Sequence, residues 1–315
     1  MSHLAAGALI DDLEPGATIA DSITSGYPPI PWISDLRASL QWESEHMFSL
    51  VKAAEGPLVA VAVHNGHDLR TEIGKKMALP EPDRLREEDP YTGRWTEIGD
   101  TRIIVRQSRF EHDLNRPRDT AIYRRPEDAW GLQMWSEELT DDEVARSLAS
   151  YDSFYQACHR CFSELEKQFG FFVVYDLHSY NHMRNGPDGE AADPASNPEV
   201  NVGTGSLDRG RWGTVVDTFI EGMRSFDFLG RSLDVRENVK FLGRQLAKWT
   251  HENFPDSGCV LAVEFKKFWM DEWSGELHQE KFDAITRALG STTAEVVAAA
   301  RQASKPGPRA GQRST

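Results

Sequence analysis

The sequence predicts an α/β protein with a mixed, largely parallel central sheet and helices on both of its faces. Three observations support this class: continuous apolar runs of strand length, helical segments between them, and polar residues directly after the runs. Strands that alternate with helices favour such a covered sheet. With 315 residues, of which 39% are hydrophobic, the chain can fill its core.

The predicted elements begin with a helix over 34–54, capped by Ser34, and continue with a strand in PLVAVAVH. A second strand is expected in TRIIVRQSRFEHD, a helix over 140–169, and a buried strand in FGFFVVYDLHS. A further helix is expected in FLGRQLAKWTHENF, before a last strand in CVLAVEFKKFW. Because ligands of such sheets bind where strands end, we expect chemistry just past VAVAV and FFVVYDL.

The chain divides into three predicted parts. Residues 1–35 are rich in turn formers and predict a surface arm, residues 36–303 a single α/β domain, and residues 304–315 a disordered tail. Within the domain, residues 181–213 are long, rich in Gly and Pro, and almost devoid of core formers. That composition suits a functional loop, and we interpret the segment as a candidate lid.

The charge of the chain limits its partners. Thirty-five Lys and Arg against fifty Asp and Glu give a formal charge of -15, which repels nucleic acid and anionic membranes at long range. A small anionic substrate stays compatible with that charge, because a cleft can carry a local positive field. The oligomeric state is not predicted.

The protein is expected to be cytoplasmic. No apolar run approaches the roughly 20 residues that span a bilayer, and the N-terminus lacks a basic region followed by an apolar core. Three cysteines are too few for a disulfide framework. Cys158 and Cys161 form a C-x-x-C pair, but apolar residues around them recur at helical spacing, so we interpret both as helix residues rather than a redox or metal pair.

Three of the ten histidines are candidate metal ligands. His64 and His67 follow one buried strand at an i, i+3 separation, and His178 ends another strand. Zinc is commonly held by three nitrogen or oxygen ligands, with a fourth position left for water. The alternative is that these histidines are ordinary polar residues at strand ends.

Neighbouring residues favour the metal interpretation. Gly66 offers the backbone freedom that a tight ligand loop needs, and Asp176, two residues before His178, could orient an imidazole. His182 is an alternative third ligand.

Two further groups carry chemistry. The segment SRFEHDLNRPR concentrates charged and amide side chains, and its arginines suit a carboxylate, although a solvated strand end or an ion-pair network would have the same composition. Glu264 follows a run of buried apolar residues in CVLAVEFKKFWMDE. A carboxylate at such a position has either a paired structural role or a catalytic one.

The blocks VAVHNGHDLR, SRFEHDLNRPR, AWGLQMW, YDLHSYNH, NPEVNVGT and VEFKKFWMDE occur in this order and span residues 60 to 273. In this respect the sequence resembles the N-formylglutamate amidohydrolase family, which is related to zinc carboxypeptidases and aspartoacylases. The resemblance implies a zinc-exopeptidase-like (phosphorylase/hydrolase-like) fold for the 36–303 domain, and one Zn²⁺ per chain.

The resemblance also implies roles for individual residues. His64, His67 and His178 would bind the zinc, and Glu264 would activate its water. In carboxypeptidase relatives the second ligand is a glutamate where this chain has His67, and Asn65 stands where a serine is common in the family.

On the substrate side, the resemblance matches Asn115 and Arg116 to the Asn-Arg pair that grips a substrate carboxylate. Arg109 matches the upstream arginine that polarises the scissile carbonyl. Further expected substrate contacts in the long loop are Arg184, Asn201 and Thr204.

The predicted function is therefore zinc-dependent hydrolysis of the amide bond of an N-formyl or N-acyl acidic amino acid, with N-formyl-L-glutamate as the first candidate. The alternatives are a carboxypeptidase-like or deacylase enzyme that acts on another small amide, and a metal-binding relative without turnover.

Overall fold

The computed structural model describes residues 47–304. The predicted arm at 1–35, the first residues of the predicted helix over 34–54, and the tail beyond Ser304 lie outside the described residues. The three-part division of the chain stays a prediction.

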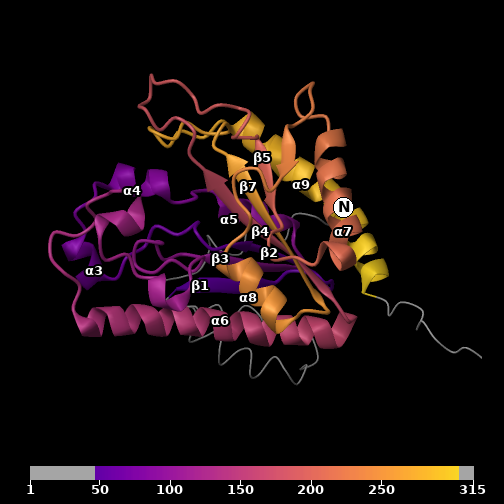
Figure 1. Cartoon of the computed structure of the whole chain (residues 1–315), viewed down its shortest axis with the longest axis horizontal. Coiled ribbons are helices and arrows are strands. Elements are labelled where there is room, and N and C mark those ends of the chain that lie inside the picture. Colours follow the sequence, from indigo (N-terminus) through magenta and orange to yellow (C-terminus); the bar gives the residue numbers. More distant parts are fainter. Residues whose placement is uncertain (1–46, 305–315) are drawn as a thin grey trace, which may run out of the picture. The chain divides into compact units, whose positions relative to one another are not determined.

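The centre of the structure is a seven-stranded sheet in the order β1-β3-β2-β4-β7-β5-β6 (Figure 1). Four of its six strand pairings are parallel, and only β1 with β3 and β5 with β7 are antiparallel. The predicted mixed, largely parallel sheet is thus confirmed. The strands are β1 (Phe48–Lys52), β2 (Leu58–Ala62), β3 (Thr101–Val105), β4 (Phe172–Tyr180), β5 (Val200–Gly203), β6 (Val235–Glu237) and β7 (Gly258–Lys266).

Helices cover both faces of the sheet, as predicted. The helices are α3 (Thr71–Lys76), α4 (Glu81–Glu87), α5 (Thr92–Trp95), α6 (Asp141–Phe169), α7 (Arg209–Ser225), α8 (Gln245–Asn253) and α9 (Gln279–Ala303), with short 3-10 turns at Thr96–Ile98, Arg118–Thr120 and Pro126–Ala129. In Figure 1, α6 and α8 lie on one side of the sheet, and α7 and α9 on the other. Along residues 47–304, no helix has the length and apolar character needed to cross a membrane.

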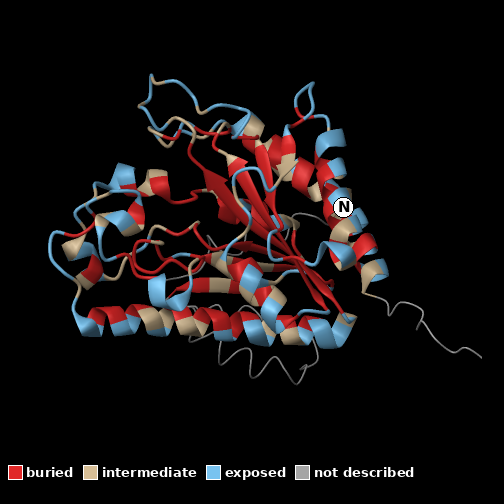
Figure 2. Cartoon of the chain, in the orientation of Figure 1, coloured by how far each residue is buried: buried red, intermediate tan, exposed pale blue. Residues whose placement is uncertain are grey.

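Alternating residues of β4 face the two helical layers. Val173 and Tyr175 belong to the core cluster that contains α7 and α9. On the opposite face, the ring of Phe172 stacks on Phe162 of α6 at a centroid distance of 4.8 Å and meets Phe254, just after α8, edge-on. Because both faces are covered, β4 is buried along its whole length (Figure 2), which explains its continuous apolar sequence.

The long helix α6 begins and ends where its sequence predicts. The Thr140 side chain accepts a hydrogen bond from the Glu143 backbone, Glu143 reciprocates in a capping box, and Gly170 ends the helix with a left-handed φ of 78°. Cys158 and Cys161 lie within this helix, as predicted.

The predicted helix over 34–54 is wrong for Phe48–Lys52, which forms the edge strand β1. There Phe48 and Leu50 are buried while Val51 is exposed, the two-residue alternation of a half-buried strand. Antiparallel pairing with β3 decides the conformation, since it supplies the hydrogen bonds that a helix would otherwise have supplied.

The interpretation of 181–213 as one long loop is also wrong in part. Val200–Gly203 forms β5, whose four residues are all buried, and α7 begins at Arg209. The strand is too short to stand out in a Gly- and Pro-rich stretch, and its pairing with β7 and β6 stabilises it.

We predict that Trp95→Ala lowers the free energy of unfolding by about 3 to 5 kcal/mol. Trp95 is fully buried, and its ring packs against Phe265, Trp269 and Phe282 at centroid distances of 4.7, 4.8 and 5.3 Å. Urea denaturation measures the change. The control is Val239→Ala at an exposed position, for which a change within about 0.5 kcal/mol is expected; equal changes in both variants would contradict the prediction.

Candidate metal centre

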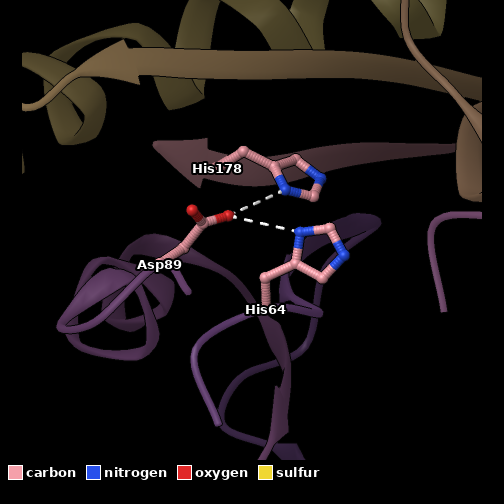
Figure 3. A group of neighbouring side chains, drawn as sticks. All are labelled: His64, Asp89 and His178. Atoms are coloured by element: carbon pink, nitrogen blue, oxygen red, sulfur yellow. Dashed lines mark hydrogen bonds and ion pairs between the residues drawn. The ribbon is translucent and has the colours of Figure 1, made fainter. Parts of the chain in front are cut away.

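Three buried side chains from distant parts of the chain converge beside the ends of β2 and β4 (Figure 3). His64 lies two residues after β2, Asp89 two residues after α4, and His178 near the end of β4. One carboxylate oxygen, Asp89 Oδ2, is 3.4 Å from His64 Nδ1 and 3.2 Å from His178 Nδ1. The two imidazole rings are 4.9 Å apart between centroids.

The spacing of these atoms fits a zinc site. Zinc bonds of about 2.0 to 2.2 Å in a tetrahedral site place the ligand atoms about 3.3 to 3.6 Å from one another. Of the two separations, 3.4 Å lies within this range and 3.2 Å just below it. Two imidazoles and one carboxylate are also a donor set that suits zinc and leaves a fourth position open.

The second nitrogen of each imidazole faces another buried carboxylate. His64 Nε2 is 2.7 Å from Asp113 Oδ1, and His178 Nε2 is 2.9 Å from Asp176 Oδ1. Asp176 thus lies where the sequence places an orienting carboxylate. Such contacts fix the orientation of a metal-binding imidazole and leave its other nitrogen free to coordinate.

The electrostatics of the group favour a cation. Burial would raise the pKa of Asp113, but Arg109 and His64 hold it well below its usual range. Burial would lower the pKa of His178, yet Asp176 and Glu264 raise it well above its usual value. Both oxygens of Asp176 are buried and lack a well-aligned hydrogen bond. Several buried carboxylates therefore lie around the two imidazoles, and their negative charge would stabilise a divalent cation bound there.

Backbone contacts hold the loop of Asp89 against the sheet. The Asp89 backbone N–H donates to the His64 carbonyl at 2.9 Å, and the Ser179 hydroxyl donates to Asp89 Oδ1 at 3.1 Å. The buried Lys267, next to the end of β7, donates to the carbonyls of Arg86 and Glu88, and burial lowers its pKa to about 8. Through these two hydrogen bonds, Lys267 stabilises the conformation of this loop.

Gly66 is required for a reason other than a special backbone angle. A Cβ atom at this position would lie 2.2 Å from the backbone carbonyl of Arg106, so only glycine lets the two segments approach this closely. That approach sets the path of the chain after His64.

The structure does not bring His67 into the group. Its Nδ1 lies 2.5 Å from Glu88 Oε2 and its Nε2 lies 2.7 Å from Arg84 Nη2, so both ring nitrogens have protein partners. Among residues 47–304, the group that could hold a metal is His64, Asp89 and His178, and it includes neither His67 nor His182. The geometry therefore favours Asp89 as the third ligand in place of the predicted His67.

Glu264 lies where a general base is expected. Parallel pairing of β4 with β7 sets it directly opposite His178, so both side chains project from the same face. Burial raises the pKa of Glu264 to about 7, with His178 acting in the opposite direction and Asp89 adding to the rise. A carboxyl group with such a pKa can both accept and release a proton near neutral pH.

The residues of the predicted Asn-Arg pair flank the group. Asn115 Nδ2 lies 3.3 Å from His178 Nε2, and its Oδ1 accepts a hydrogen bond from the Leu246 backbone. Arg116 Nε lies 3.5 Å from Asp113 Oδ2, and its Nη2 donates to the Asp128 carbonyl.

Arg109 also binds Asp113, with Nη2 donating to Oδ2 at 2.8 Å. Two more of its N–H groups donate to the Tyr123 hydroxyl and to the Glu87 carbonyl, at 3.2 and 3.3 Å. These contacts use three of the five N–H groups of the guanidinium, which leaves two for a ligand.

The three residues of the long loop that were expected to contact substrate instead contact other residues of the protein. Arg184 is half exposed and pairs with Glu87. The Asn201 side chain binds backbone groups of residues 239–241, and Thr204 hydrogen-bonds to Glu237 and Asn238. The structure does not join these residues to the metal group.

Sequence reasoning gave no role to Asp89 or Asp113. Asp113 lies inside the motif SRFEHDLNRPR, where the arginines and the amide drew attention. Asp89 lies in EEDPYTG, an acidic run with nothing to separate it from a solvated helix end. Only the spatial approach of this loop to His64 and His178 distinguishes it.

Comparison with known proteins identifies the family of this chain. The profile of the N-formylglutamate amidohydrolase family matches residues 56–267, about two thirds of the chain. The chain belongs to this family. Membership identifies it as a hydrolase of the N-formylglutamate amidohydrolase type, which acts on amide bonds.

Two solved structures with TM-scores above 0.5 share its fold. An N-formylglutamate amidohydrolase from Ralstonia eutropha JMP134 matches with a TM-score of 0.61 at 20% identity, over 81% of this chain and 98% of that one. A gene product of Agrobacterium tumefaciens matches with a TM-score of 0.56 at 19% identity, over 81% and 97%. A metallo-carboxypeptidase from Burkholderia cenocepacia has a TM-score of 0.34 at 15% identity, over 84% and 69%. No curated protein matches the sequence.

We predict about one zinc per chain in the wild-type protein, lost in Asp89→Ala and retained in His67→Ala. Asp89 Oδ2 lies beside the Nδ1 atoms of both imidazoles, whereas the two ring nitrogens of His67 contact Glu88 and Arg84. Elemental analysis after dialysis against metal-free buffer measures the content, with His178→Ala as the positive control for loss. Retention in Asp89→Ala together with loss in His67→Ala would restore the ligand set predicted from the sequence.

Proposed function

We propose that the protein is a zinc-dependent amidohydrolase that releases formate from an N-formyl acidic amino acid, with N-formyl-L-glutamate as the substrate. The supporting observation is that Asp89 Oδ2 lies 3.4 Å from His64 Nδ1 and 3.2 Å from His178 Nδ1, close to the distance between two ligand atoms of one zinc ion. Glu264 lies beside them. Family membership supports the reaction type.

His64, Asp89 and His178 would hold the zinc ion. When bound, zinc makes water acidic enough to attack at neutral pH and withdraws electrons from a carbonyl oxygen. The protein supplies the orientation: Asp113 and Asp176 lie at the Nε2 atoms of the two imidazoles, whose Nδ1 atoms both face Asp89 Oδ2.

Glu264 is the proposed general base. It takes a proton from the attacking water as the new C–O bond forms at the formyl carbon, and delivers a proton to the nitrogen as the C–N bond breaks. The products are formate and the free amino acid. A pKa raised to about 7 suits both halves of this transfer.

Cationic and amide groups next to the site would bind the acidic substrate. Asn115 and Arg116 are proposed to hold the carboxylate nearest the formyl group, because Asn115 contacts His178 and Arg116 contacts Asp113. Arg109 is proposed to stabilise the negative charge on the carbonyl oxygen with an N–H group that its three present contacts leave over. A locally positive site would attract an anion to a protein of formal charge -15.

We predict that Glu264→Gln lowers kcat for formate release from N-formyl-L-glutamate by about 10² to 10⁴-fold and leaves the zinc content unchanged. The amide has the size of the carboxyl group but cannot accept the proton. A coupled formate assay and elemental analysis test both parts on the same preparation.

Two controls accompany this variant. Thermal unfolding of Glu264→Gln tests whether the variant remains folded. A panel of N-acetyl amino acids and dipeptides, assayed with the wild-type protein, tests whether another small amide is preferred. A wild-type protein that binds zinc and cleaves one of those amides, but not N-formyl-L-glutamate, would keep the hydrolase and reject the proposed substrate.

A further inference from the structure

A cavity of about 610 Å³ opens beside Asn115 and carries no acidic residue in its lining. Its lining residues include Asn115, Arg116, Gly243, Arg244, Gln245 and Lys248. Three of them are cationic. In a chain with fifty acidic residues, a cavity lined by cations alone among the charged residues is a distinct electrostatic environment.

A second cavity shows that arginine content alone does not create this environment. It measures about 770 Å³ and has three cationic residues in its lining as well, the arginines Arg118, Arg124 and Arg125. Four acidic residues share that lining, however, namely Asp119, Asp128, Glu137 and Glu138. Of these two cavities, the one beside Asn115 combines a purely cationic set of charged residues with closeness to His178, which Asn115 contacts.

The position of Arg244 follows from two glycines. A Cβ at Gly203, in β5, would lie 2.4 Å from the Gly243 backbone nitrogen, so the chain around Gly243 packs directly on the end of β5. Gly243 itself has a φ of 84°, and a Cβ there would lie 3.4 Å from the Ala262 side chain. Ala262 precedes Glu264 by two residues in β7 and shares its face. Arg244 is thereby held next to the face that bears the candidate base.

Arg244 is exposed, and within residues 47–304 its guanidinium has no hydrogen-bond or ion-pair partner. Lys248, in contrast, forms an ion pair with Glu252, with 3.7 Å between Nζ and Oε1. Arg116 lies beside the Asp113 carboxylate and donates a hydrogen bond to the Asp128 carbonyl. Arg244 is therefore the arginine of this lining whose full hydrogen-bonding capacity is available to a ligand.

We propose that Arg244 recognises the side-chain carboxylate of the substrate and so selects acidic amino acids over neutral ones of equal size. Asn115 links the two ends of the site, since its amide contacts His178 while its carbonyl groups accept hydrogen bonds from Gln245 and Leu246 at the start of α8. The α-carboxylate, next to the scissile amide, would bind at Asn115 and Arg116, and the more distant carboxylate reaches Arg244. This inference rests on the proposed function.

The first test compares N-formyl-L-glutamate with N-formyl-L-glutamine, which has the same shape without the charge. We expect Arg244→Ala to lower kcat/KM for the glutamate substrate by about 10- to 100-fold, mainly through KM, and for the glutamine substrate by less than about threefold. Arg244→Lys is expected to fall between, because it keeps the charge but loses the bidentate geometry. The matched control is Arg287→Ala, an exposed arginine of α9, for which no selective change is expected.

The second test measures binding without turnover. Calorimetric titration with L-glutamate and L-glutamine should show that Arg244→Ala weakens glutamate binding about tenfold or more and leaves glutamine binding unchanged. Equal losses for both substrates and both ligands, or no loss for either, would overturn the role of Arg244. If the wild-type protein releases no formate but binds glutamate through Arg244, the carboxylate site stands and the proposed reaction fails. Absence of both formate release and selective binding would reject both proposals.

Discussion

The parallel pairing of β2, β4 and β7 is the constraint on which the site depends. It brings the carboxyl ends of three strands to one edge of the sheet, so that His64, His178 and Glu264, far apart in sequence, meet there. The register of β4 against β7 is equally decisive, since a shift by one residue would turn Glu264 to the opposite face. Burial of both strands on both faces makes such a shift costly.

The site that results is a dense set of buried carboxylates around two imidazoles. Asp89 Oδ2 lies beside the Nδ1 atom of each ring, and Asp113 and Asp176 lie at the Nε2 atoms. Buried charges of one sign are stable only when they are paired or bound to a metal. Arg109 and Arg116 both lie beside Asp113 and compensate part of this charge. The remaining negative charge explains why this group suits a divalent cation, and it is a stronger argument for a metal than the presence of histidines.

The residues proposed to bind substrate are in contact with the same carboxylate and imidazole side chains. Asp113 joins the metal group to Arg109 and Arg116, so that the residues proposed to bind substrate are fixed by the residue that orients His64. Asn115 joins His178 to the start of α8 and hence to the cavity that Arg244 lines.

The amino-acid sequence was enough to predict the fold class, most of the central strands, the helix over 140–169, and the candidate site residues His64, His178 and Glu264. Each of these has a strong local signal: a continuous apolar run, a helical period, or a polar residue that ends such a run. Tertiary structure alone decided the edge strand Phe48–Lys52 and the short strand Val200–Gly203, whose conformations depend on pairing with distant strands. It also placed Asp89, rather than His67, beside His64 and His178. A spacing of three residues suggests that His64 and His67 bind one metal ion. Only the three-dimensional path of the chain shows that His67 is turned toward Glu88 and that a loop 25 residues beyond His64 brings a carboxylate to the two imidazoles.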